Sequence, residues 1–139
     1  ILCGRLGVRF VLASPSGYEF KPEVQKQLLA DAPGMDLEVI TDPMDAVKGV
    51  DAVFTDTFTS MGQEAEKEAR LKAFAGYQVN DALVSHAADH AIVLHCLPAY
   101  RGVEITDEVM DGPRSRVFPE AHNRLHAQKG LLAVLMGGA

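Results

Sequence analysis

The chain has 139 residues, 47% of them hydrophobic, which is enough to bury the core of one domain but not of two. Its formal net charge of −6 argues against a nucleic-acid surface, which needs clustered Lys and Arg, and against binding to anionic membranes. No apolar run approaches the roughly 20 residues that cross a bilayer, and the first residues lack a signal-peptide pattern, so a cytoplasmic protein is expected. Cys3 and Cys96 lie far apart in the sequence, and we interpret both as free thiols in a reducing compartment.

Strand-like and helix-like patterns alternate along the chain. Short β-branched apolar runs predict strands, whereas apolar residues at helical spacing after Pro, Asp or Asn predict helices. In chain order we expect a helix end over 1–6, a strand over 8–13, a helix from 22 to the Pro-Gly at 33–34, a strand over 37–41, a short helix over 42–48, a strand over 51–56, a helix over 63–75, a short helix after 80, a strand over 91–96 and a long helix from about 119 to 136.

This alternation predicts the fold class. Strands separated by helices need crossover connections, which produce parallel strands with helices on both faces of the sheet. We therefore predict an α/β fold with a doubly wound, Rossmann-like parallel sheet. The sequence shows no internal repeat of domain size, no low-complexity tract and no long linker.

Polar residues follow one of the predicted strands at the sheet edge where ligands of such folds bind. Asp56 ends the strand and leads into the polar loop 57–64, so its carboxylate is a candidate for binding a substrate ammonium group. Asp56 is equally typical of a turn residue. Ser60 has the spacing of a helix N-cap with Gln63 as its capping-box partner, and spacing alone favours that structural role.

The strand over 91–96 delivers His95 and Cys96 to the same edge, followed by Leu97-Pro98. The Cys96 thiol could meet a substrate there, although a free Cys in a strand is more often an inert buried residue. The Leu97-Pro98 bond is a candidate for a cis peptide, which would leave the Leu97 carbonyl available to a ligand.

Arg124, near the start of the last helix, offers a planar cation suited to a carbonyl or phosphate oxygen, and otherwise belongs to a solvated helix face. Two His pairs, 86 with 90 and 122 with 126, have a zinc-ligand spacing, but neither is followed by an obvious third ligand, so no metal site is predicted. The glycines form neither a dinucleotide fingerprint nor a phosphate loop, so no nucleotide cofactor is predicted.

Three segments, in this order, resemble ornithine carbamoyltransferases: DTFTSMGQE at 56–64, HCLP at 95–98 and EAHNR at 120–124. Each segment is a weak indication alone, but all three in the same order along the chain are a specific one. The likeness also includes GYQVN at 76–80 and DGPRS at 111–115, and thus runs over almost the whole chain.

The resemblance implies a site for ornithine in the first of these segments. Asp56 would bind the α-amino group of ornithine, and Ser60 and Met61 would hold its amino-acid end. Phe58 stands where the family often has Trp, and this exchange keeps an aromatic wall.

The resemblance implies the reacting groups in the other two segments. Cys96 would lie near the δ-amine of ornithine and, with Arg124, would act in catalysis. The Leu97 carbonyl and Arg124 would contact the carbamoyl group of carbamoyl phosphate.

The likeness covers only the carboxyl-terminal, ornithine-binding half of such an enzyme, so residues 1–139 are expected to be part of that domain. Nothing matches the family's Ser-x-Arg-Thr-Arg phosphate loop, its His-Pro-x-Gln segment or its Asp-Gly-Asn-Asn stretch. Because the last of these ends the first, central strand of the domain, we expect this chain to lack an interior strand. The start without Met agrees with a chain cut from a longer protein, and we expect the piece to be poorly stable and inactive alone.

The implied activity is carbamoyl transfer from carbamoyl phosphate to ornithine, giving citrulline and phosphate for arginine biosynthesis, in a cytoplasmic homotrimer without cofactors. Two alternatives stay open: a non-catalytic amino-acid-binding module, and a carbamoyltransferase acting on another amine such as putrescine. Asp56 and the loop 60–62 favour an acceptor that carries an α-ammonium group.

Overall fold

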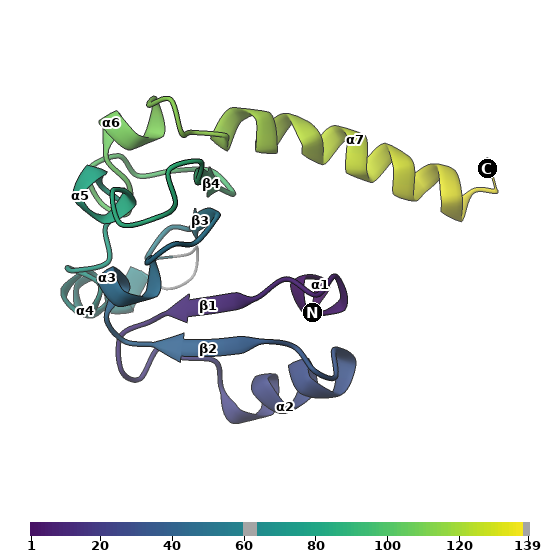
Figure 1. The fold of residues 1–139 in the computed structure, drawn as a ribbon, viewed down its shortest axis with the longest axis horizontal. Coiled ribbons are helices and arrows are strands. Elements are labelled where there is room, and N and C mark those ends of the chain that lie inside the picture. Colours follow the sequence, from purple (N-terminus) through teal and green to yellow (C-terminus); the bar gives the residue numbers. More distant parts are fainter. Residues whose placement is uncertain (60–63, 138–139) are drawn as a thin grey trace.

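The structure is a computed structural model that describes residues 1–59 and 64–137, and its helices and strands alternate along the chain (Figure 1). The elements are α1 (Leu2–Arg5), β1 (Phe10–Ala13), α2 (Pro22–Asp31), β2 (Leu37–Ile40), α3 (Pro43–Ala46), β3 (Ala52–Thr55), the 3-10 helix η1 (Glu64–Glu66), α4 (Lys67–Ala73), α5 (Asp81–Val84), β4 (Ile92–His95), α6 (Asp107–Met110) and α7 (Val117–Leu135).

The four strands form two parallel pairs. In one pair Phe10 of β1 lies opposite Leu37 of β2, and in the other Ala52 of β3 lies opposite Ile92 of β4. Among the described residues no strand ladder joins one pair to the other, so the sheet is present in two pieces. The predicted α/β class with parallel strands is confirmed.

The main apolar core lies in the second half of the chain, around β4. Val93 of β4, Ile105 and Val117 are all 0% exposed and belong to one cluster of packed side chains. The edge of β4 that faces away from β3 is covered by a connecting segment: the Val93 N–H donates to the Arg114 carbonyl, and the Val93 carbonyl accepts from the Arg116 N–H. β4 is therefore hydrogen-bonded along both of its edges.

Three of the short helices begin at side chains that cap them. Asp42 Oδ1 accepts the Met44 N–H at 2.8 Å ahead of α3, and Asn80 Oδ1 accepts the Leu83 N–H at 3.0 Å ahead of α5. Thr106 caps α6 in the same way. The sequence predicts short helices at α3 and α5, whereas the predicted elements do not include α6.

The other differences from the predicted elements lie at their ends. α7 begins at Val117, two residues before the predicted start at Pro119. Proline is tolerated in this first turn because N–H groups there have no partner within the helix. The single helix predicted over 63–75 is described as η1 followed by α4.

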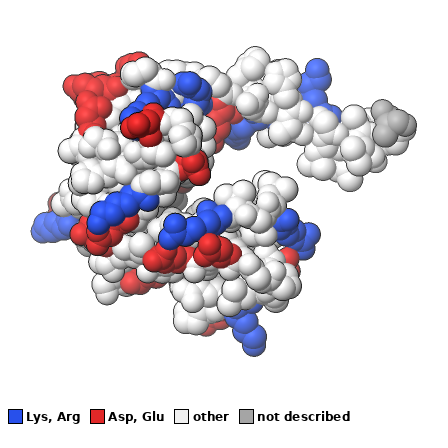
Figure 2. Space-filling view, viewed as in Figure 1, with Lys and Arg blue, Asp and Glu red and all other residues white. Residues whose placement is uncertain are grey.

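α7 projects from the rest of the molecule toward the C-terminus (Figure 1). Its outer half is mostly white in the space-filling view, whereas acidic and basic side chains intermingle over the body (Figure 2). Within residues 1–59 and 64–137, every helix is too short or too polar to reach across a lipid bilayer.

Candidate functional site at the ends of β3 and β4

β3 and β4 end side by side, and two of the candidate residues follow them directly. Thr55 lies opposite His95 in the parallel register, so Asp56 and Cys96 are the first residues beyond the two strands. Ligands of parallel α/β folds bind outside this carboxyl edge of the sheet. The structure therefore brings Asp56 and Cys96 together at the edge where a site is expected.

The Cys96 thiol is held in its protonated form. Burial raises its pKa, and a hydrogen bond with Asp56 together with the negative charge of that carboxylate raises it further, to about 11. Because the thiolate is the nucleophilic form of cysteine, this site does not suit Cys96 as a nucleophile at neutral pH. It suits a neutral thiol beside a carboxylate.

Asp56 also contacts the backbone of the residue that follows it. Its Oδ1 accepts the backbone N–H of Thr57 at 2.6 Å, and its side chain is exposed to solvent. The carboxylate therefore makes a local contact with the backbone, and it remains accessible to a cationic ligand.

The segment after Cys96 turns sharply. The Leu97–Pro98 peptide bond is cis, as predicted, and Leu97 has a φ of 53°, in the left-handed region. The Leu97 N–H donates to Nδ1 of His95 at 2.9 Å. Within the described part of the chain no backbone N–H donates to the Leu97 carbonyl.

α7 reaches the same edge through Glu120. Its Oε2 accepts the backbone N–H of His95 at 3.1 Å, a contact that sequence reasoning missed because 25 residues separate the two. Arg124 lies one helical turn farther along α7 and is exposed. Among the described residues the structure records no contact that joins Arg124 to Asp56 or Cys96.

The predicted contacts of Ser60 and Met61 lie outside the described residues. Just before them, Phe58 stacks on Phe74 with ring centroids 4.9 Å apart. Both rings line a hollow of about 390 Å³, together with Gln78 and Asn80. An aromatic wall therefore borders the loop that follows Asp56.

Three of the four histidines with zinc-ligand spacing make side-chain contacts that the structure records. His122 and His126 face each other on α7 with their Nε2 atoms 3.2 Å apart, and His90 Nε2 lies 2.7 Å from Asp51 Oδ1. Across residues 1–59 and 64–137, no three or more His, Cys, Asp or Glu side chains gather as metal ligands would.

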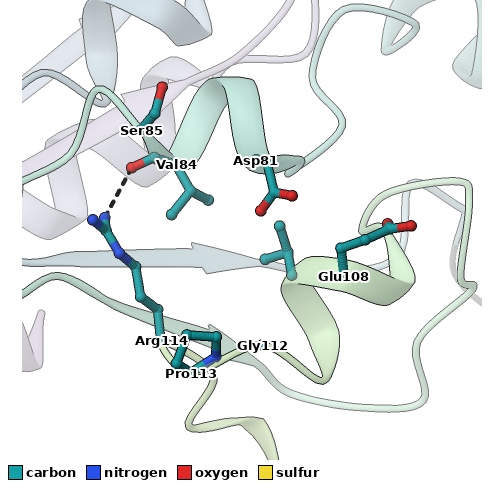
Figure 3. A pocket seen from close by; sticks show the side chains of 8 residues that line it. Asp81, Val84, Ser85, Glu108, Gly112, Pro113 and Arg114 are labelled. Atoms are coloured by element: carbon teal, nitrogen blue, oxygen red, sulfur yellow. Dashed lines mark hydrogen bonds between the residues drawn. The ribbon is translucent and has the colours of Figure 1, made fainter.

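A second hollow, of about 300 Å³, lies between α5 and α6 (Figure 3). Asp81 and Glu108 lie on its helical walls, and Arg114 donates to the carbonyls of Val84 and Ala88 at 3.1 and 3.3 Å. Arg114 thus caps the end of α5, which is a structural role, and none of the predicted site residues lines this hollow.

Known proteins are similar to this chain in sequence and in fold. The family described as "Aspartate/ornithine carbamoyltransferase, Asp/Orn binding domain" matches residues 1–135. The chain is 51% identical to an ornithine carbamoyltransferase of Gloeobacter violaceus, over 98% of this chain and 44% of that protein, and 53% identical to one of Archaeoglobus fulgidus, over 94% and 42%. The solved ornithine carbamoyltransferase of Pyrococcus furiosus superposes with a TM-score of 0.86 at 49% identity, over 98% of this chain and 44% of that one.

The chain thus spans less than half the length of the relatives that it matches. Within that part, the family's sequence pattern extends over nearly every residue, and the fold agrees with solved members. The chain belongs to the aspartate/ornithine carbamoyltransferase family and corresponds to its Asp/Orn binding domain.

Proposed function

We propose that this chain supplies the ornithine-binding half of an ornithine carbamoyltransferase, with residues 1–139 forming part of that domain. The observation that carries the proposal is the pairing of Asp56 and Cys96 beyond the adjacent ends of β3 and β4. A carboxylate and a neutral thiol at one sheet edge suit a substrate with an ammonium group at one end and a reacting amine at the other.

The reaction is attack of the neutral δ-amine of ornithine on the carbonyl carbon of carbamoyl phosphate. A C–N bond forms, the bond from the carbonyl carbon to the phosphate oxygen breaks, phosphate leaves and the nitrogen loses a proton, giving citrulline. A primary alkylamine has a pKa of about 10.4 in water, so the site must favour the uncharged amine. The neutral Cys96 thiol adds no negative charge of its own that would stabilise the charged amine.

The roles of the residues follow from the family resemblance and from this edge. Asp56 binds the α-amino group, with Ser60 and Met61 at the amino-acid end of ornithine. Cys96 lies beside the δ-amine. The Leu97 carbonyl and Arg124 contact the carbamoyl group, where Arg124 polarises the carbonyl oxygen.

The Asp56→Ala variant of the full-length enzyme tests this assignment. Loss of a charge-assisted contact should weaken ornithine binding about tenfold to a hundredfold. Carbamoyl phosphate binding, measured by calorimetry in the same samples, should change far less. Asp51→Ala is the matched control, since Asp51 is 82% exposed and pairs with His90 away from the site. Equal losses for both substrates in the Asp56 variant would refute the assigned role.

A second test concerns the chain by itself. The purified 139-residue chain should form no citrulline from ornithine and carbamoyl phosphate, because the dianionic phosphate would lack the arginine cluster of the family's other half. Measurable citrulline formation by this chain would contradict the proposal that phosphate binding depends on the other half of the enzyme.

Putrescine, offered to the full-length enzyme in place of ornithine, tests which amine is the acceptor. Equal turnover of the two amines would favour an acceptor without an α-carboxylate.

The complete enzyme is proposed to be a cytoplasmic homotrimer that acts in arginine biosynthesis. The free Cys3 and Cys96 fit a reducing compartment, and the trimer rests on the family resemblance. The mass of the full-length protein, measured by light scattering in solution, tests the assembly.

A further inference from the structure

His95 and Glu104 form a fully buried polar pair behind the candidate site. Both side chains are 0% exposed, and His95 Nε2 lies 3.1 Å from Glu104 Oε1. Burying two polar side chains is costly unless each is hydrogen-bonded. The proposed reaction assigns neither residue a contact with substrate.

The hydrogen bonds of His95 define which ring nitrogen carries the proton. Nδ1 accepts the backbone N–H of Leu97 at 2.9 Å, so Nδ1 is unprotonated. The ring proton of the neutral imidazole therefore lies on Nε2 and is donated to Glu104. A doubly protonated ring would turn an N–H of Nδ1 against the N–H of Leu97.

Glu104 is in turn fixed by the backbone around it. Its Oε1 also accepts the N–H of Tyr100 at 2.5 Å, and its own carbonyl accepts the N–H of Val79 at 2.8 Å. Its other oxygen, Oε2, is buried and has no hydrogen-bond partner among the described residues. Burying the Glu104 carboxylate with one oxygen unpaired is unfavourable. Its place beside the loop that follows β4 therefore indicates a role beyond packing.

We propose that His95 and Glu104 are a positioning pair that sets the Leu97 carbonyl in place for the carbamoyl group. Leu97 occupies the left-handed region at a φ of 53°, a conformation that is unfavourable for a residue with a Cβ. The His95 imidazole stabilises this conformation through the Leu97 N–H, and Glu104 fixes the imidazole. The inference rests on the proposed function, because it needs the Leu97 carbonyl to contact substrate.

Two substitutions of His95 in the full-length enzyme separate the two ends of the pair. His95→Asn keeps an acceptor near the position of Nδ1 and loses the donor to Glu104, whereas His95→Gln keeps a donor near Nε2 and loses the acceptor for Leu97. The Gln variant should lose about tenfold to a hundredfold in kcat/KM for carbamoyl phosphate, the effect of a displaced contact group. The Asn variant should lose less. Binding of ornithine should change less than about threefold in both, because Asp56, its proposed ammonium contact, follows β3 and not β4.

Substitutions of Glu104 distinguish a residue that only positions the His95 ring from one that transfers a proton. Gln accepts the same hydrogen bonds through its amide oxygen, so Glu104→Gln should restore most of the activity that Glu104→Ala loses. For His95→Gln, the matched control is His90→Gln, since His90 also faces a carboxylate but is 74% exposed. If Glu104→Gln is as inactive as Glu104→Ala, or if these variants lose thermal stability while kcat and KM stay unchanged, the proposal is wrong.

One measurement does not depend on activity or on any variant folding. The ¹⁵N chemical shifts of the wild-type His95 ring should report a neutral imidazole protonated at Nε2. A proton on Nδ1 would overturn the positioning pair even in an active enzyme. Absence of citrulline formation by the wild type, with the Nε2 form observed, would instead refute the proposed function and leave the hydrogen-bonded pair intact.

Discussion

At the scale of single residues, Cys96 and Asp56 determine each other's chemistry. A thiol with a pKa of about 11 is protonated at physiological pH, so it can donate a hydrogen bond to Asp56 but cannot act as a thiolate. The sequence left an inert and a reactive Cys96 open. The structure supports a third description, a neutral thiol that contacts the site without attacking a substrate.

The reactivity of Cys96 should therefore depend on its neighbour. Asp56→Asn removes the negative charge that helps to raise the pKa, so the pKa of Cys96 should fall and alkylation by iodoacetamide at pH 8 should accelerate. If the pKa of Cys96 falls by one pH unit, the fraction of Cys96 present as thiolate at pH 8 rises about tenfold. Peptide mass spectrometry measures the rate at Cys96, and Asp51→Asn should leave it unchanged. An unchanged rate in the Asp56 variant would show that the carboxylate does not influence the thiol.

The candidate residues differ in how far the sequence could identify them. Asp56, Cys96 and Leu97 could be found because each follows a recognisable apolar strand. The roles of Glu104 and Glu120 could not, since both reach His95 from outside β4 and neither lies in a local pattern that predicts burial.

At the scale of elements, the short helices depend on their caps. α5 has four residues, and isolated helices of that length are unstable in water, so Asn80 and the packing of Leu83 and Val84 must hold it. Its position matters because Val79, just before the cap, bonds to the Glu104 carbonyl and so supports the buried pair.

Removing this cap should loosen α5. Asn80→Ala should lower the local opening free energy by about 1 kcal/mol, because the Leu83 N–H loses its acceptor. Hydrogen exchange of the amides over 81–87 in the full-length enzyme measures the change. Asn80→Asp retains an acceptor and should exchange as the wild type does. Equal protection in all three would mean that the cap contributes nothing.

At the scale of the whole molecule, the chain exposes more surface than a closed domain of its mass. Its accessible surface is 9197 Å², whereas a compact monomer of 15.0 kDa exposes about 7,000 Å². Several exposed apolar side chains lie on α7, including Leu131, Leu132 and Leu135, and Phe54 of β3 is 57% exposed. These surfaces agree with a fold that is completed by further polypeptide.

The isolated chain should consequently be only marginally stable. Its free energy of unfolding in urea should fall below the roughly 5 kcal/mol at the lower end for native proteins, and it should bind the dye ANS through exposed apolar surface. The full-length enzyme serves as the reference. Cooperative unfolding above that value without dye binding would contradict this expectation.

The sequence by itself determined the alternation of strand and helix, the short helices that follow Asp42 and Asn80, and the three segments that resemble the carbamoyltransferases, because each is encoded within a few consecutive residues. Only the tertiary structure decided that the strands form two separate pairs, that Thr55 lies opposite His95, and that His95 is enclosed by Glu104 and Glu120. Such long-range contacts depend on strand register and on packing between distant segments, and no local pattern of residues specifies either.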